Sequence, residues 1–192
     1  MRTFVAIELE PPVRQAVVDV QATIKRELGR LPDARPQWVR PESLHLTLKF
    51  LGEIDDGNLP DILVALRIAA QRQGGFSLAV QGLGVFPDVR APKTLWVGLS
   101  GDVDKLTVLA GAVEEALIPA GIEPEGRPFK PHLTIARIKD GAREIGKTLT
   151  AYGILDSRLE IGTMNVQEIV LMKSDLKPSG SVYTRLDTVP LG

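Results

Sequence analysis

His45-Leu46-Thr47-Leu48 and His132-Leu133-Thr134-Ile135 are two copies of one four-residue pattern, and they contain the only two histidines of the chain. In a β-strand, successive side chains point to opposite faces. The histidine and the threonine of each copy therefore share one face, while the aliphatic residues point to the other. Each copy predicts a half-buried strand that presents an imidazole and a hydroxyl on its open face.

Composition limits the classes to which the chain can belong. With 192 residues, 44% hydrophobic and 24% charged, it has the composition of a globular domain that spans residues 1–192. The absence of cysteine excludes a disulfide framework, a thiolate nucleophile and a zinc–thiolate site. The first apolar run is interrupted by Glu8 and Glu10, and none reaches membrane-spanning length. We expect a soluble cytoplasmic protein, a monomer by default.

Hydrophobic periodicity predicts alternating strands and helices around the two motifs. Continued alternation places Phe50 on the core face of the first motif strand. We expect strands near 3–9, 44–51, 76–86, 94–99 and 182–186, with one or two more in 155–171. Helices are expected over 11–28, 59–73 and 103–117, with a short helix after Asp140 and a hairpin turn at 177–180.

The two halves of the chain repeat the order strand, helix, motif strand, helix, strand. This weak duplication predicts one domain of two pseudo-symmetric lobes, from repeat units of about 1–90 and 91–192, with the motif strands facing each other across a cleft. A doubly wound parallel sheet is the alternative. We favour an antiparallel α+β fold, because the last strands suit hairpins and no glycine-rich phosphate loop follows a strand.

Two facing imidazoles suit the chemistry of phosphodiesters. That reaction needs a base for the attacking oxygen and an acid for the leaving oxygen, and a pKa of about 6.5 allows histidine to do either near neutral pH. Thr47 and Thr134 can donate hydrogen bonds to the non-bridging oxygens. A metal site is less favoured, because neither motif is a clustered ligand pattern such as His-Glu-x-x-His.

Basic residues surround the second motif. Arg127, Lys130, Arg137 and Lys139 occur without an intervening acid, and the first three are candidate phosphate ligands. Strict alternation places Arg137 behind the sheet unless a strand end or a bulge redirects it. A solvated strand edge is the alternative explanation of this charge. Because the formal net charge is −1, we expect any nucleic acid to be held locally.

With both motifs in view, the chain resembles the 2H phosphoesterases, whose name refers to two His-x-Thr/Ser-x motifs. More narrowly it resembles the bacterial and archaeal RNA 2′,3′-cyclic phosphodiesterases, which are also described as 2′-5′ RNA ligase-like proteins. The matching segments span nearly the whole chain and comprise residues 4–7, 45–53, 95–98, 127–137 and 171–174, with Tyr183.

The resemblance implies a bilobal α+β fold of mainly antiparallel sheets, with outer helices around a central cleft. It implies cofactor-free and metal-independent hydrolysis of a terminal RNA 2′,3′-cyclic phosphate to a 2′-phosphomonoester. His45 would be the general acid that protonates the 3′-oxygen, and His132 the base that activates water. Reversible, ATP-independent 2′-5′ ligation is implied as a secondary reaction. The residues alone do not show which histidine is the acid and which is the base.

Other functions explain parts of the pattern. The first is a non-catalytic module that binds RNA ends or nucleotides in the same cleft. The second is a structural scaffold whose histidines and threonines only satisfy hydrogen bonds. Within the enzyme class, hydrolysis of cyclic nucleotides or of ADP-ribose cyclic phosphate is a close variant. Trp96, Phe129 and Tyr183 are aromatic residues that can stack a base.

Overall fold

The computed structural model describes residues 1–32, 34–156, 158–177 and 180–192, and it confirms the predicted α+β class with two antiparallel sheets. Sheet A has strand order β3-β1-β8-β9, and sheet B has order β2-β6-β5-β4-β7. The strands of sheet A are β1 (Arg2–Glu8), β3 (His45–Glu53), β8 (Glu168–Lys177) and β9 (Gly180–Pro190). The strands of sheet B are β2 (Pro36–Trp38), β4 (Phe76–Phe86), β5 (Thr94–Gly101), β6 (Leu133–Ile138) and β7 (Glu160–Val166).

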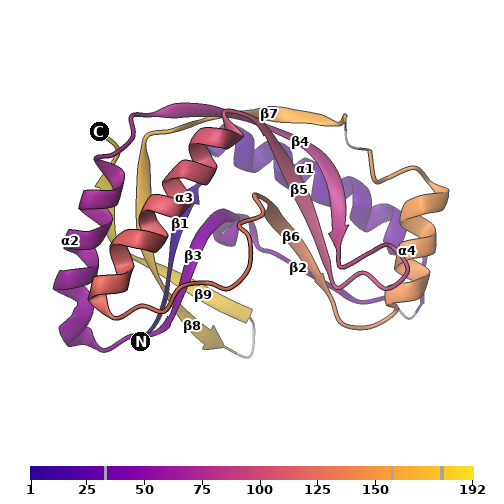
Figure 1. Ribbon diagram of the computed structural model, residues 1–192. Helices are drawn as coiled ribbons and strands as arrows, with labels where there is room; N and C mark the ends of the chain where they lie inside the picture. Colours follow the sequence, from indigo (N-terminus) through magenta and orange to yellow (C-terminus); the bar gives the residue numbers. More distant parts are fainter. Residues whose placement is uncertain (33, 157, 178–179) are drawn as a thin grey trace.

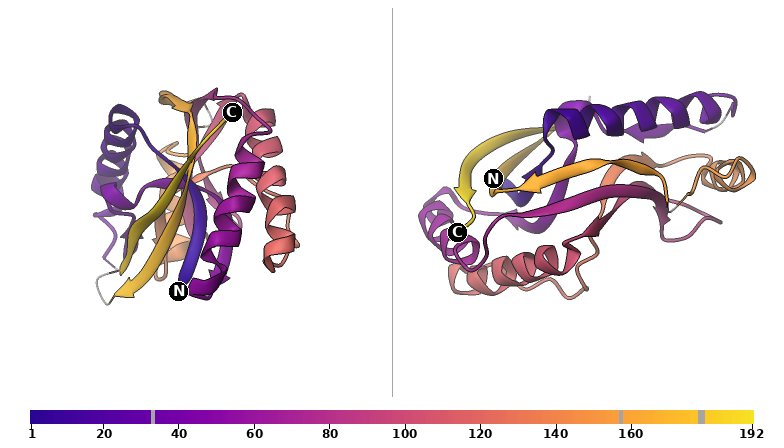
Figure 2. Two further views of the ribbon diagram at one scale, coloured as in Figure 1. Left: turned by 90° about the vertical axis from the view of Figure 1, so that its left-hand side faces the viewer. Right: turned by 90° about the horizontal axis from the view of Figure 1, so that it is seen from above.

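Helices cover the outer faces of the two sheets, and the molecule has the shape of an arch (Figure 1). The described residues form α1 (Pro11–Leu28), α2 (Leu59–Ala70), α3 (Val103–Leu117) and α4 (Ala142–Ala151), with short 3-10 turns η1 (Pro41–Ser43), η2 (Asp56–Asn58) and η3 (Ile118–Ala120). Helices α2 and α3 lie side by side against sheet A (Figure 2), whereas α1 packs on β7 of sheet B and contacts α4. We call sheet A with α2 and α3 lobe A, and sheet B with α1 and α4 lobe B.

The lobes are interleaved along the chain. Strand β1 lies in sheet A, but the helix after it covers sheet B; β5 lies in sheet B, but the helix after it covers sheet A. The order β3-β1-β8 in sheet A matches the order β6-β5-β4 in sheet B, so the two motif strands occupy equivalent places. Each lobe therefore takes elements from both halves of the chain, and the repeat units 1–90 and 91–192 stay a prediction.

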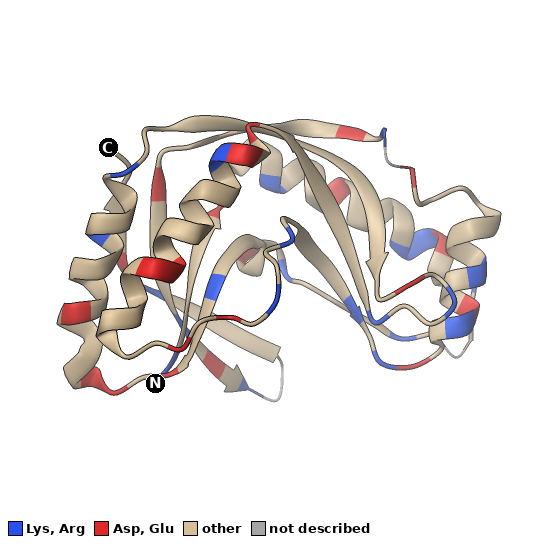
Figure 3. Cartoon of the chain, in the orientation of Figure 1, with Lys and Arg blue, Asp and Glu red and all other residues tan. Residues whose placement is uncertain are grey.

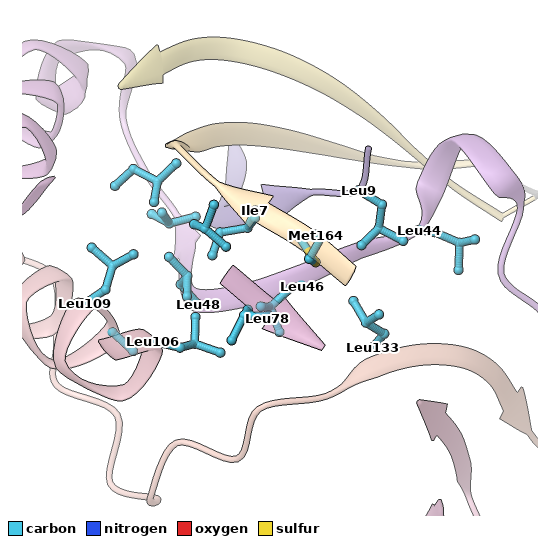
Figure 4. Close-up of a cluster of buried hydrophobic side chains, with 14 of the residues drawn as sticks. Ile7, Leu9, Leu44, Leu46, Leu48, Leu78, Leu106, Leu109, Leu133 and Met164 are labelled. Carbon is cyan, nitrogen blue, oxygen red and sulfur yellow. The ribbon is translucent and has the colours of Figure 1, made fainter. Parts of the chain in front are cut away.

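The backs of both motif strands share one hydrophobic core. Leu46 and Leu48 of β3 and Leu133 of β6 belong to a single buried cluster with Leu106 of α3 and Met164 of β7 (Figure 4). A slip of one residue in either strand would expose its leucines to solvent. Burial of these leucines therefore fixes the register in which the histidines face outward.

Three segments differ from the sequence-based expectations or extend them. The short strand β2 was not predicted; it pairs with β6 and adds an outer strand to sheet B. Strand β9 is longer than the predicted 182–186. In the predicted turn at 177–180, Pro178 and Ser179 lie outside the described residues, but β8 and β9 on either side pair from Lys177 and Gly180 onward. Among the described helices, none has the length and apolar character needed to cross a membrane.

Candidate active site

A cleft of about 510 Å³ lies between the two sheets, and both motifs line it. His45 and Thr47 reach it from β3, and His132 and Thr134 reach it from the start of β6. All four are partly exposed, whereas the leucine between the histidine and threonine of each motif has no exposed surface. The structure thus brings together the four motif residues that the sequence predicts for one site.

A bulge in β3 changes the orientation of the side chains after the first motif. Ala6 pairs with Thr47 and Val5 with Lys49, so Leu48 has no partner on β1. An unpaired residue shifts the alternation of a strand by one position. Leu48 and Lys49 are consequently both buried, while Phe50 is 52% exposed and lines the cleft. The prediction that Phe50 belongs to the core is therefore wrong.

Strand β6 has a bulge at the equivalent position of the second motif. Trp96 pairs with Thr134 and Leu95 with Ala136, which leaves Ile135 without a partner on β5. Arg137 is exposed and lines the cleft as a result. This is the bulge that the sequence argument requires if Arg137 is to reach the cleft. Phe50 and Arg137 now occupy equivalent places, three residues after the threonine of each motif.

The two imidazoles are held in the same way. Nδ1 of His45 lies 2.8 Å from the Ser43 carbonyl oxygen, and Nδ1 of His132 lies 2.6 Å from that of Lys130. A carbonyl oxygen only accepts, so Nδ1 is the donor and carries hydrogen in both rings. In each neutral ring Nε2 is then the nitrogen that can take a proton, and in each charged ring it can give one.

The surroundings of the two histidines differ. The His45 ring packs 4.8 Å from the Phe4 ring and 5.1 Å, edge-on, from Tyr183. Burial among these rings is the main reason that the pKa of His45 lies below its usual value, and the Arg137 charge lowers this pKa further. The Ser43 carbonyl and the Glu8 carboxylate act in the opposite direction. His45 is therefore biased toward the neutral form.

His132 lies against a second aromatic group in lobe B. Its ring contacts Phe86 edge-on at 5.1 Å, and Phe86 packs at 5.1 Å from Trp96. The ammonium group of Lys130 lies 5.8 Å from the centre of the Phe86 ring. Phe86 is thus placed to hold both the imidazole and the nearby cation.

The remaining predicted basic residues lie outside the cleft lining. Arg127 and Lys130 are exposed on the irregular segment before β6, where basic residues colour the loop and the adjoining strand (Figure 3). Lys130 holds His132 through its carbonyl oxygen rather than through its charge. Of the three predicted basic ligands, the structure places only Arg137 in the cleft.

Several cleft residues were not predicted as site residues. Arg2, Phe4 and Phe86 line the cleft together with Phe50 and with Tyr183, which the sequence offers as a residue that can stack a base. The one sequence signal at Phe4 is that residues 4–7 belong to the segments that carry the family resemblance; that β1 pairs with the motif strand β3 is visible only in the structure. Phe86 carries no such signal, because it lies outside those segments, and its strand β4 is separated from the motif strand β6 by β5. Among the described residues, no group of three or more His, Asp or Glu side chains is arranged to hold a metal ion.

Comparison with known proteins gives consistent matches over the whole chain. The family model of the LigT like phosphoesterases matches twice, at residues 7–96 and 97–183. An RNA 2′,3′-cyclic phosphodiesterase of Methanothermobacter thermautotrophicus is 33% identical over 191 residues, covering 100% of this chain and 99% of the relative. A relative of the same name from Aquifex aeolicus is 35% identical and covers 93% of both chains.

Solved structures agree in fold. A protein of Thermus thermophilus superimposes with a TM-score of 0.80 at 30% identity and covers 100% of this chain and 98% of that one. Escherichia coli LigT in complex with NADP+ superimposes with a TM-score of 0.73 at 26% identity, covering 99% of this chain and 96% of that one. The same protein has also been crystallised with 3′-AMP, ATP and phosphate.

Proposed function

The chain belongs to the LigT-like phosphoesterase family, and from this premise we propose that it hydrolyses the 2′,3′-cyclic phosphate at the end of an RNA. The product is a 2′-phosphomonoester with a free 3′-hydroxyl. The observation that carries this proposal is the pair of His-x-Thr motifs that line one cleft from two lobes. The names of the curated relatives support it.

The reaction needs only proton transfers and the stabilisation of charge. Water attacks phosphorus while the P–O3′ bond opposite to it breaks, so a base and an acid are needed on opposite sides. In our proposal Nε2 of His132 takes a proton from the water, and Nε2 of His45 gives a proton to the departing 3′-oxygen. Two histidines from facing lobes suit this in-line geometry. No metal or cofactor takes part in the proposed steps.

The environment of His45 is compatible with the role of the acid. Burial lowers the pKa of His45, which makes its protonated form a stronger acid. The negative charge of a bound phosphodiester favours that protonated form. Binding of the substrate would therefore charge His45 in the complex, where the proton is needed.

Neighbouring residues are proposed to bind the substrate. The hydroxyls of Thr47 and Thr134 donate to the non-bridging oxygens, and the Arg137 guanidinium offers a charged fork to the same phosphate. Phe50 gives the base or ribose an exposed aromatic surface. Lys130 and Arg127 attract the RNA from outside the cleft.

A nucleotide with a 2′-phosphate should act as a product analogue. Escherichia coli LigT has been crystallised with NADP+, whose adenosine carries such a phosphate. We therefore expect adenosine 2′-monophosphate and NADP+ to compete with the cyclic substrate in this chain. Ligation is proposed as a secondary reaction, in which the hydroxyl of a second RNA replaces water and forms a 2′-5′ linkage without ATP.

The decisive experiment uses a short RNA that ends in a 2′,3′-cyclic phosphate, incubated with the protein and excess EDTA. A 2′-phosphate product that disappears with His45→Ala and His132→Ala is expected. Lys147→Ala is the control, because Lys147 is exposed and pairs with Glu144 on α4. Binding of the RNA without turnover by folded wild-type protein would instead favour a non-catalytic RNA-end or nucleotide-binding module. Dependence on a divalent ion would contradict the metal-free mechanism.

A second substrate separates the two histidine roles. Replacing the bridging 3′-oxygen by sulfur creates a leaving group that departs without a proton. If His45 is the acid, His45→Ala should lose much less activity on the sulfur substrate than on the oxygen substrate. His132→Ala should be equally impaired on both. The reverse pattern would exchange the two assignments.

A further inference from the structure

Lys49 is a charged residue in the core that the proposed mechanism does not use. It lies on β3 between Thr47 and Phe50, and the bulge at Leu48 turns it away from the cleft. Only 1% of its surface is exposed. A buried ammonium group is costly unless it is paired and hydrogen-bonded, so its partners indicate what it holds in place.

The partners of Lys49 connect helix α3 to the segment that precedes β6. The ammonium nitrogen donates to Oε2 of Glu114 at 2.8 Å and to the carbonyl oxygen of Glu123 at 3.0 Å. The other oxygen of the Glu114 carboxylate accepts a hydrogen bond from the backbone N–H of Glu125. Lys49 and Glu114 together therefore bind the backbone at two positions of one short segment.

That segment, residues 121–132, leads directly into the second catalytic motif. It contains no helix or strand, and residues 123–128 are all exposed. Figure 1 shows it passing from the end of α3 across β3 to the start of β6. Ile122 is buried at one end and Phe129 packs against the core at the other. The hydrogen bond that Lys49 donates and the one that Glu114 accepts hold the exposed part between Ile122 and Phe129.

The backbone connects the part of the segment held by Lys49 and Glu114 to His132. The Lys130 carbonyl oxygen fixes Nδ1 of His132, and this carbonyl lies five residues after Glu125. We propose that the Lys49–Glu114 pair is a positioning device, which fixes the approach segment so that the Lys130 carbonyl orients His132. A residue of lobe A would thus set the geometry of the histidine of lobe B. This inference rests on the proposed function for its effect on turnover.

The test compares Lys49→Met with Lys147→Met, which removes an exposed lysine from the Lys147–Glu144 pair on α4. A glutamate-specific protease reports on the segment, because Glu125 is followed by Gly126, whereas Glu123 is followed by Pro124 and resists cleavage. Lys49→Met should be cut after Glu125 about tenfold faster, and its kcat should fall about tenfold to a hundredfold with a smaller change in KM. Lys147→Met should match the wild type in both measurements.

NMR gives a readout that simple destabilisation would not produce. The chain has two histidines, so each imidazole signal can be assigned with His45→Ala and His132→Ala. Lys49→Met should shift the His132 signals and leave those of His45 in place. If Lys49→Met does not fold, the double variant Lys49→Met/Glu114→Met replaces it. That variant buries no unpaired charge, and it still lacks the two hydrogen bonds to the backbone of Glu123 and Glu125.

The outcomes separate this inference from the proposed function. If a folded Lys49 variant has the same rate of cleavage after Glu125, the same kcat and the same His132 signals as the wild type, the positioning role is overturned. If the wild-type protein has no turnover, the proposed function fails, while cleavage after Glu125 and the His132 signals still decide whether the pair positions the segment.

Discussion

Gly84→Ala tests how tightly β4 packs against Trp96, which supports Phe86 and through it the ring of His132. A methyl group on Gly84 would lie 2.2 Å from Cζ2 and 2.3 Å from Cη2 of Trp96. Carbon atoms in contact are normally about 3.5–4.0 Å apart, so the indole or β4 must move by more than about 1 Å. Trp96 packs on Phe86, and Phe86 on His132, each at 5.1 Å between ring centres. The displacement therefore leads toward the imidazole of His132.

Overpacking of this kind costs about 1–3 kcal/mol. Urea denaturation followed by circular dichroism should show that loss in the free energy of unfolding, together with a lower kcat. Gly111→Ala is the matched control, because its added methyl meets no atom within 4 Å apart from its chain neighbours and the backbone of its own helix. Gly111 lies within α3, where alanine is the better helix former by about 0.5–1 kcal/mol.

The two substitutions should therefore change stability in opposite directions. Gly84→Ala/Trp96→Phe should recover part of the loss, because the smaller ring leaves room for the methyl group. Equal stability of the wild type and Gly84→Ala would refute the close packing of Trp96 on β4. A stability loss with unchanged kcat would refute the connection from Trp96 through Phe86 to His132.

Three further predictions concern the cleft. Because the folded state lowers the pKa of His45, the unfolded chain binds a proton at His45 more readily than the folded chain does. The free energy of unfolding, measured by urea titration, should therefore fall as the pH drops through about 6.5. His45→Phe should show a weaker dependence of this free energy on pH. Arg137→Met should raise the pKa of His45, measured by NMR titration, because a nearby positive charge is removed; an unchanged pKa would contradict this electrostatic contact. Phe50→Ala should raise KM for RNA roughly tenfold with little change in kcat, as expected when one stacking contact is lost, and an unaltered KM would show that Phe50 does not touch the substrate.

The candidate site residues can be predicted from the sequence because the information that places them is local. Alternation of side chains over three residues is enough to place a histidine and a threonine on one face. Repetition of the pattern then suggests that the two histidines act together. The structure places His45 and His132 in one cleft, as this argument expects. Leu46 and Leu133, predicted to lie behind the motifs, are fully buried.

The residues immediately after the motifs could not be predicted in the same way. A bulge depends on how a strand pairs with its neighbour, and neither β1 nor β5 reveals its register in its own sequence. For this reason alternation alone places Phe50 on the core face and leaves the position of Arg137 dependent on a bulge. Lys49 was not recognised as a buried residue for the same reason. The exchange of helices between the lobes is equally non-local, because it depends on contacts between distant segments.

The two bulges also explain how a duplicated motif can form a site that is not symmetric. Both lobes supply an imidazole with the same tautomer and a threonine, and a cleft with these groups alone would accept a phosphate in two opposite orientations. The equivalent residues after the bulges differ, because Phe50 offers an apolar surface from the strand of His45, whereas Arg137 brings a positive charge from the strand of His132. A nucleotide has one aromatic end and one charged end, so these residues favour one orientation over the other. We therefore expect the difference between Phe50 and Arg137 to help decide which histidine meets the attacking water and which meets the leaving oxygen.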